Sequence, residues 1–412
     1  MTGYLRLLQR HSAALGFGFL AVFWGNFGQT FFIGAFSASI QDSLAVTAGT
    51  YGAVYSLATL ASALTVVWAG SLIDRVPLSG YTTALCLGLA GASLLMWQVE
   101  GLVLLAFGFY GLRLFGQALL PHTGMTTLAR RFDQDRGKSL SIASSGVPVG
   151  EIVMPLIGVA LIALVGWQTT FLLIALLMLL AVLPLMHYLI RRAGLVDVST
   201  VPEQPRSAPM QARLQLLGDR CYWLALPGLM APAFIVTGIF IHQDFVIASQ
   251  GWTPAWFAIC FVVYGTVHWL ASLAVGLLVD RYGAVHLLAF YLLPMATGLF
   301  LMVALSGLWV AMLLMVLLAL TIGAIPPITG ALWAEVYGVA SLGTIRSMNM
   351  AVMVFATSLS PIVYGIGIDR GVHADLMFGG SGVYVLLAAV LMSVSYRDSI
   401  RKTQNDDPKG NP

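Results

Sequence analysis

Apolar stretches of about 20 residues recur along the whole chain, and each is long enough to cross the hydrocarbon core of a bilayer. Hydrophobic residues make up 59% of the 412 positions and charged residues only 9%, which is too little charge to cover the surface of a soluble protein of this length. Inside hydrocarbon every backbone N–H and C=O group has to be bonded within the protein, and long apolar segments achieve this as helices. The sequence therefore predicts an all-α membrane protein.

Charge clusters and turn residues divide the chain into twelve predicted transmembrane helices. They cover residues 13–39, 50–72, 79–98, 101–129, 139–163, 168–190, 221–247, 254–279, 284–305, 308–334, 345–367 and 380–396. One long polar segment, 191–219, separates the first six from the last six. We therefore expect an N-terminal six-helix bundle (1–190), a cytoplasmic linker and a C-terminal six-helix bundle (220–397), followed by a disordered polar tail over 398–412.

Lysine and arginine residues segregate to one side of the membrane under this assignment. Only Arg370, on the opposite side, and Arg113, within a span, depart from the pattern. Because basic loops remain in the cytoplasm, we expect both termini to be cytoplasmic in a multi-pass protein of a bacterial-type inner (plasma) membrane.

Sequence motifs of enzymes and of metal sites are missing. The three cysteines, Cys86, Cys221 and Cys260, are far apart and lack the spacing of zinc or iron–sulfur ligands. The sequence contains no Gly-x-Ser-x-Gly, no His-Glu-x-x-His and no Walker phosphate-binding motif. We therefore predict that the protein is not an enzyme and has no metal site and no cofactor.

The two halves of the chain repeat each other at a fixed offset of 206 residues. The loop after the second helix of each half carries the same residue types at the same spacing: Gly70, Asp74 and Arg75 in the first half, and Gly276, Asp280 and Arg281 in the second. The same offset aligns Pro121 and Gly124 with Pro327 and Gly330. Two parallel halves of six helices are a common transporter plan, in which the solute site lies near the midplane between them.

The repeated loop, together with the twelve spans, resembles the major facilitator superfamily over essentially the whole chain. The resemblance implies alternating access by rocking of the two bundles. It also implies that the six loop residues act in the conformational switch and do not touch the substrate. The alternative is that they are ordinary loop charges that follow the membrane topology.

A second resemblance concerns the segment from Arg131 to Gly146, which is similar to the start of helix 5 in the monocarboxylate and oxalate–formate transporter group. That group has an arginine in helix 8, four residues before the loop glycine. This chain has Ser272 at that position, which opposes a simple monocarboxylate as the cargo.

Polar side chains within the spans are the candidate functional residues, because each costs several kcal/mol in hydrocarbon unless it has a partner. Distance along the helices from the basic loops places a set of them in the middle third of the membrane. The predicted substrate-binding residues are Asn26, Gln29, Arg113, Gln117, Tyr264, His268 and Trp269. Arg113 is the strongest candidate, since a permanently charged guanidinium suits a carboxylate or another anionic group. Its alternative role is a fixed ion pair with Glu151.

Glu151 and His122 are the predicted proton-coupling residues. The alternatives are a helix–helix contact for Glu151 and a backbone hydrogen bond for His122. His242 and Asp244 lie near the outer face, where a solvated helix end is favoured over a role in gating or coupling. Trp24 stands at mid-depth, where stacking on a planar solute competes with packing.

The sequence therefore predicts secondary active, proton-coupled transport of a small organic anion. The alternatives are uptake of a planar metabolite or vitamin, and efflux of drugs or metabolites without anion recognition, in which Glu151 neutralises Arg113. The expected partners are the small-molecule substrate, a co-transported proton and the lipid bilayer. A net charge of +3 gives no indication of a nucleic-acid partner, and we expect a monomer.

Overall fold

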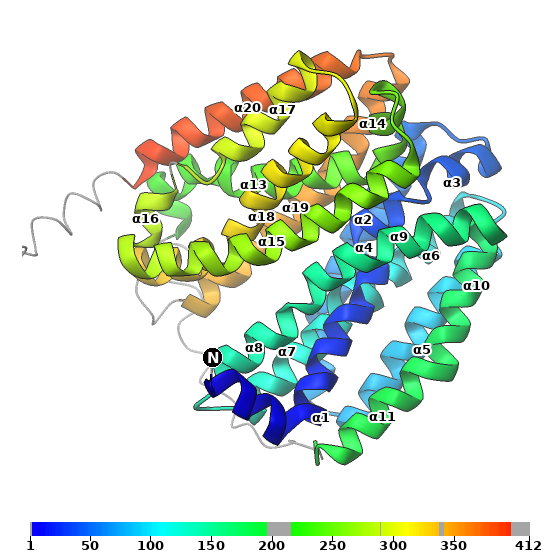
Figure 1. Cartoon of the computed structure of the whole chain (residues 1–412), viewed down its shortest axis with the longest axis vertical. Coiled ribbons are helices and arrows are strands. Elements are labelled where there is room, and N and C mark those ends of the chain that lie inside the picture. The colour runs from blue at the N-terminus through cyan, green and yellow to red at the C-terminus, as the bar shows by residue number, and fades with distance from the viewer. Residues whose placement is uncertain (1, 196–215, 289, 338–341, 397–412) are drawn as a thin grey trace, which may run out of the picture.

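The computed structural model describes residues 2–195, 216–288, 290–337 and 342–396, and every regular element within them is a helix. The predicted tail 398–412 and most of the predicted linker 191–219 lie outside the described residues. The helices form two bundles, blue to green and green to red in Figure 1. The predicted all-α fold of two six-helix bundles is therefore confirmed.

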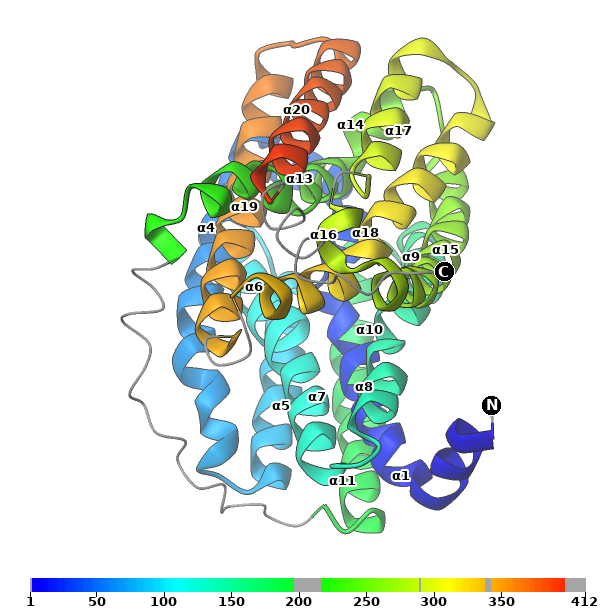
Figure 2. The ribbon, with the colours of Figure 1, turned by 90° about the vertical axis from the view of Figure 1, so that its left-hand side faces the viewer.

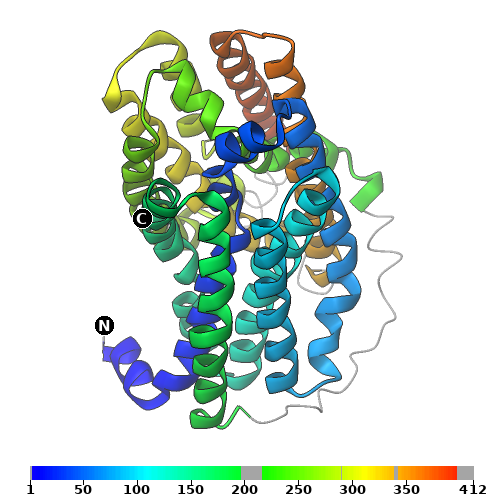
Figure 3. The same cartoon turned by 90° about the vertical axis from the view of Figure 1, so that its right-hand side faces the viewer.

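The N-terminal bundle contains helices that join into six segments. Their elements are α1 (Thr2–Gly25), η1 (Asn26–Gly28), α2 (Thr30–Gly34), α3 (Ser37–Leu44), α4 (Ala48–Ala69), η2 (Gly70–Asp74), α5 (Leu78–Trp97), α6 (Leu102–Gly111), η3 (Leu112–Leu119), α7 (Leu120–Arg131), α8 (Arg136–Ser144), α9 (Gly146–Val165), α10 (Trp167–Leu177), η4 (Met178–Val182) and α11 (Leu183–Arg192). The segment before His11 turns away from the rest of α1 at a non-helical residue (Figures 2 and 3).

The C-terminal bundle repeats this plan with fewer interruptions. Its elements are α13 (Arg220–Ile241), α14 (Gln243–Ser249), α15 (Pro254–Tyr282), α16 (Ala284–Leu287), α17 (Leu293–Ala304), α18 (Leu308–Tyr337), α19 (Leu342–Asp369) and α20 (Ala374–Ser395).

Length and apolar character show which of the described helices can cross a membrane. Ten qualify, or eleven if the bent pair Tyr4–Gly34 and Ser37–Leu44, which meet at 65°, counts as one span. Three predicted spans are interrupted instead of continuous: 13–39 breaks after Gly25, 221–247 breaks at His242, and 284–305 is divided into α16 and α17. Hydropathy records the length of an apolar stretch and does not show these breaks.

The break in the first span occurs where another helix supports the backbone. Gly28, in η1, lies so close to η3 that a Cβ there would overlap the carbonyl oxygen of Leu112, and a Cβ on Gly116 would come within 2.8 Å of the Gly28 nitrogen. Irregular backbone is tolerated at membrane depth where protein surrounds it. Glycine at both positions allows that contact.

The two bundles meet through α4 against α19 and through α9 against α15. The ribbons converge there and diverge toward the N terminus (Figure 1). We call the side with the basic loops after η2 and α7 the inner side, and the opposite one the outer side. Under the positive-inside prediction the inner side is cytoplasmic.

Candidate functional site

Arg113 lies in the middle of the fourth span, in a stretch of π-helix (η3). Such wide turns inside α-helices occur frequently at functional sites. The side chain is only 3% exposed, and it points toward the interrupted first span. Its NH1 group lies 3.4 Å from both the carbonyl oxygen of Gly28 and the Oγ1 of Thr30, at the long end of the hydrogen-bond range.

The surroundings of Arg113 leave most of its donors unused. The guanidinium carbon lies 5.2 Å from the centre of the Tyr55 ring, whose hydroxyl is 3.1 Å from the Oγ1 of Thr30. The Nε of Arg113 is buried without a hydrogen-bond partner, and within the described residues no carboxylate forms a salt bridge with it. The alternative of a fixed ion pair with Glu151 is therefore wrong. A buried guanidinium with free donors is chemically suited to an anion.

Glu151 instead pairs across the bundle interface with His268. The Oε2 of Glu151, on α9, lies 2.7 Å from the Nδ1 of His268, on α15, and the two side chains are 6% and 13% exposed. Gly265 brings the helices together, because a Cβ there would lie 2.6 Å from the carbonyl oxygen of Pro148. The predicted cavity residue Tyr264 is buried, with its ring 6.0 Å from that of His268. The pair gains a net attraction when the imidazole is protonated.

Asn26, Gln29 and Gln117 all lie close to the break in the first span. Asn26 is fully buried, and its Nδ2 donates to the carbonyl oxygens of Phe23 and Gly146 at 3.0 and 2.9 Å. Gln29 is the half-buried residue before α2, and Gln117 is half-buried in η3. Asn26 thus joins the end of α1 to the start of α9, while the two glutamines remain near Arg113.

Trp24, Trp269 and His122 stand apart from these contacts. The ring of Trp24 lies 4.9 Å from that of Phe23, and its Nε1 is buried without a partner. Trp269 is 43% exposed on α15, although it directly follows His268. His122 is exposed on α7, where its Nε2 faces Gly70. The structure does not bring Trp269 or His122 into the Arg113 or the Glu151 cluster.

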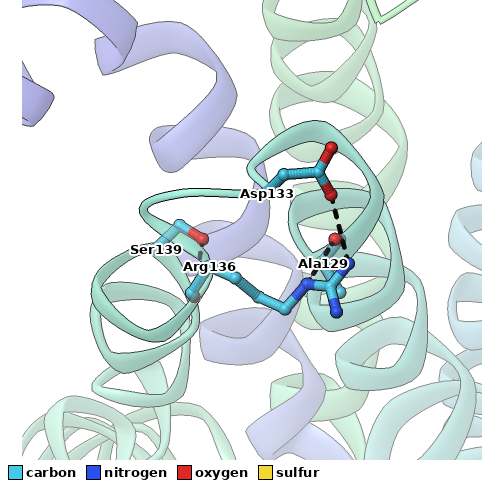
Figure 4. Close-up of polar contacts among 4 residues, drawn as sticks. All are labelled: Ala129, Asp133, Arg136 and Ser139. Carbon is cyan, nitrogen blue, oxygen red and sulfur yellow. Dashed lines mark hydrogen bonds and ion pairs between the residues drawn. The ribbon is translucent and has the colours of Figure 1, made fainter.

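The inner loops are held separately within each bundle. Asp74 forms a salt bridge with Arg130 at the end of α7, and Arg136 donates to Asp133 and to the carbonyl oxygen of Ala129 (Figure 4). Arg75 is exposed. These contacts fix the turn between α7 and α8 inside the N-terminal bundle.

The corresponding loop in the C-terminal bundle is closed differently. Asp280 is exposed, and Arg281 stacks on Tyr282 with 5.2 Å between the guanidinium carbon and the ring centre. The first N–H groups of α16 are bonded by Glu335, whose carboxylate accepts from Ala284 at 2.9 and 3.1 Å. The repeated loop motif therefore has different partners in the two halves, and a switch role for its residues stays a prediction.

The outer side of the molecule contains a set of cross-bundle hydrogen bonds that the sequence did not indicate. Asp244 accepts from Ser37 and Gln41 at 2.8 and 3.0 Å. Asp369 accepts from the hydroxyl of Thr47 at 2.7 Å and from the backbone N–H of Gly49 at 3.1 Å. We call this set the outer gate. Each carboxylate belongs to the C-terminal bundle and each donor to the N-terminal bundle.

His242 lies beside the outer gate and is 1% exposed. Its Nε2 is 2.8 Å from the carbonyl oxygen of Pro361, and Gly52 of α4 packs against the same ring. The predicted solvated helix end is therefore wrong for His242, which the docked N-terminal bundle covers, whereas Asp244 stays half-buried and bonded to Ser37 and Gln41. Both residues stand at the ends of apolar spans, and nothing in their local sequence distinguishes a covered end from a solvated one.

Cross-bundle hydrogen bonds between described residues occur only at the outer gate, at Gln243 with the carbonyl oxygen of Phe31, and at the Glu151–His268 pair. The inner loops contribute none among the same residues. This structure is thus held closed on the outer side, while the inner ends of the bundles are separate.

Two helical bundles that meet around buried polar groups at mid-membrane define a multi-pass membrane transporter. The profile of the Major Facilitator Superfamily matches residues 18–267 and 233–411, and the chain belongs to that family. Members of the family bind small-molecule substrates within the membrane, so the chain is a transporter and not an enzyme, as the sequence predicted.

Similar solved structures agree with this fold. One is a bacterial homolog of the human lysosomal transporter Spinster, inward-facing and unoccupied, with 14% identity and a TM-score of 0.73 over 95% of this chain and 98% of that one. The same homolog in its occupied form has a TM-score of 0.69 and 14% identity, over 95% of this chain and 97% of that one. The nucleoside transporter NupG has a TM-score of 0.67 and 14% identity, over 91% of this chain and 99% of that one. No curated protein matches the sequence.

We expect Gly52→Leu to open the outer gate. A side chain at Gly52 would overlap the carbonyl oxygen of Pro361, and such overpacking costs about 1–3 kcal/mol, which shifts the balance of two conformations by about 5- to 150-fold. Spin labels at Asp42 and Ser306, on the outer ends of the two bundles, measure the opening as longer label-to-label distances. Gly91→Leu is the control, because nothing lies within 4 Å of a Cβ there. Equal distance distributions in both variants would show that this contact does not hold the outer side closed.

Proposed function

We propose that the protein transports a small organic anion by alternating access and that Arg113 binds the anionic group. The observation that carries this proposal is the buried guanidinium with an unpartnered Nε and long hydrogen bonds to Gly28 and Thr30. An unneutralised charge in the membrane interior is retained only where function requires it. A carboxylate of the cargo would supply the short, charge-assisted bonds that the protein does not.

The cargo site would be centred on the break in the first span. Thr30 and Tyr55 contribute hydroxyl groups beside Arg113, and Gln29 and Gln117 lie near it. Because Arg113, η1 and α4 belong to the same bundle, the anion would move with the N-terminal bundle. Asn26 has a supporting role in this proposal, since its donors are used by the backbone.

Coupling to protons is assigned to the Glu151–His268 pair. It is a cross-bundle contact near the midplane, so a rocking motion of the bundles has to stretch or break it. Protonating Glu151 removes the carboxylate charge that attracts His268, and this lowers the cost of separating α9 from α15. Glu151 is thus the proposed proton carrier, with His268 as its partner. His122 stays a second, independent candidate on the inner side.

A planar neutral solute is the second candidate cargo. It is favoured by the buried, unpartnered Nε1 of Trp24, which offers a hydrogen bond beside an aromatic face. The structural likeness to NupG, a nucleoside transporter, is compatible with it. Under this alternative Arg113 would contribute stacking and not charge neutralisation. Efflux with Arg113 neutralised by Glu151 is not supported, because Glu151 pairs with His268.

Arg113→Ala is expected to abolish binding of the anionic cargo. Removing one partner of a buried, hydrogen-bonded charge pair costs about 2–5 kcal/mol, or at least about thirtyfold in affinity. Purified protein is first screened for thermal stabilisation by organic acids, vitamins and drugs, since a ligand that binds only the native state raises the midpoint. The best ligand is then tested on Arg113→Ala, with Arg192→Gln as the surface control. Unchanged stabilisation of Arg113→Ala by an anion would remove Arg113 from the site, and a neutral planar ligand with the same effect on both proteins would support the second candidate.

Glu151→Gln is expected to separate transport from proton coupling. The amide keeps the size of the side chain but carries no proton in the cycle, so an inward proton gradient should no longer accelerate uptake into liposomes, while exchange of cargo across the membrane continues. His268→Gln, which removes the partner and leaves the carboxylate, is the matched variant and should retain part of the acceleration. If uptake by the unmodified protein is insensitive to the gradient, Glu151 is not a proton carrier.

A further inference from the structure

A cavity lies on the flank of the N-terminal bundle, away from the residues of the proposed transport site. It has a volume of about 400 Å³ and lies between the start of α5 and the end of α11, on the inner side. In Figure 1 these two helices form the edge of the N-terminal bundle that is farthest from the C-terminal bundle. Ser79, Gly80, Thr83, His187, Arg191 and Leu195 are among the residues that line the cavity. The cavity is within the size range of ligand sites.

Arg191 gives this cavity a positive charge, although most of the lining is apolar. Arg191 is exposed, and no described residue forms a hydrogen bond or salt bridge with its side chain. The cavity also includes Ser79 and Gly80 in the first turn of α5, whose N–H groups have no partner within the helix, and α5 has no side-chain cap. A helix N-terminus next to an arginine is a favourable place for a phosphate group. No aspartate or glutamate is among the described residues that line the cavity.

His187 and Thr83 connect the two walls of the cavity. Its Nδ1 lies 3.0 Å from the carbonyl oxygen of Leu183, and its Nε2 lies 3.1 Å from the Oγ1 of Thr83. The Thr83 hydroxyl also lies 2.9 Å from the carbonyl oxygen of Ser79, so its single proton has two acceptors. Both ring nitrogens of His187 are therefore engaged within the protein, by Leu183 and Thr83.

The position of the cavity indicates a lipid as the source of the phosphate. The apolar part of α11 ends at Arg191 and Arg192, which is the depth at which headgroups lie. Exposed apolar side chains continue from α11 into η4 toward mid-membrane: Tyr188 is 51%, Leu185 39% and Leu180 74% exposed. Acyl chains can lie against these side chains while the headgroup occupies the cavity.

We propose that the cavity between α5 and α11 binds the phosphate of an anionic phospholipid of the inner leaflet, through Arg191, the first turn of α5 and the hydroxyl group of Ser79. The site is separate from the cargo site, so it does not depend on the identity of the cargo or on proton coupling. It joins the two helices that close this edge of the N-terminal bundle.

The test is a native mass spectrometry titration of the full-length protein with phosphatidylglycerol in detergent micelles, with phosphatidylcholine as the zwitterionic comparison. Arg191→Gln should weaken the binding of the first phosphatidylglycerol by about tenfold, the effect of one lost charge-assisted contact. Arg192→Gln is the matched control, because it removes the same charge from the next residue, whose NH1 is bonded to the Tyr188 hydroxyl at 2.7 Å. Its affinity should stay within about twofold of the unmodified protein.

A second variant fills the cavity without changing the charge. No atom lies within 4 Å of the position that a Cβ on Gly80 would take, so Gly80→Leu is accommodated in the fold and should also lose the tight phosphatidylglycerol. Equal weakening by Arg191→Gln and Arg192→Gln, or equal affinity for the two lipids, would overturn the proposal in favour of general surface attraction. Displacement of phosphatidylglycerol by millimolar glycerol 3-phosphate or inorganic phosphate would overturn the lipid assignment and indicate a soluble phosphate ligand.

Discussion

The requirement that backbone groups be bonded inside hydrocarbon governs how this protein can present a charge at mid-membrane. The first span is interrupted at η1 only because η3 lies against it, through glycines at positions 28 and 116. The interruption leaves the carbonyl oxygen of Gly28 available, and Arg113, carried by η3, is the residue that approaches it. The irregular backbone and the buried charge thus support each other: each would be costly alone. The buried guanidinium of Arg113 therefore lies at the contact between two distorted helices of one bundle.

The two polar clusters near the midplane differ in how they respond to motion. Arg113, Thr30 and Tyr55 are all in the N-terminal bundle, so their geometry is preserved when the bundles rotate as rigid bodies. Glu151 and His268 are in different bundles, so neither bundle alone fixes their distance. In the proposed mechanism, cargo recognition by Arg113 and proton coupling by Glu151 are therefore physically separated. A ligand or a proton changes the conformational balance only through a difference in its affinity for the two states, and the pair on α9 and α15 is the place where such a difference arises most directly.

Sequence patterns brought Glu151 and His268 to the same level of the two bundles but did not predict the direction in which polar side chains point. Apolar length and the basic loops indicated the two bundles, and the depth estimate placed Glu151 and His268 at the same level without indicating that they pair. Neighbours on a helix are separated by about 100° around its axis, which is why His268 contacts the other bundle while Trp269 is 43% exposed. The burial of His242 depends on the docking of the two bundles, and no local pattern encodes that docking. The breaks at His242 and between α16 and α17 were missed for the same reason, since supporting contacts come from other helices.

The strength of the outer gate is consistent with a contact that has to open in every cycle. Its four hydrogen bonds to Asp244 and Asp369 go to charged groups, which makes each worth about 1.5–3 kcal/mol when fully buried. Water reaches this partly exposed set and lowers the value to about 1 kcal/mol each. Their sum of about 4 kcal/mol is similar to the roughly 5.5 kcal/mol that converts a 1:99 population into 99:1. A charged pair between the bundles at this position would be harder to separate once buried. Neutral donors on one bundle and carboxylates on the other hold the outer side closed, while leaving it within reach of the free energy that binding of a cargo supplies.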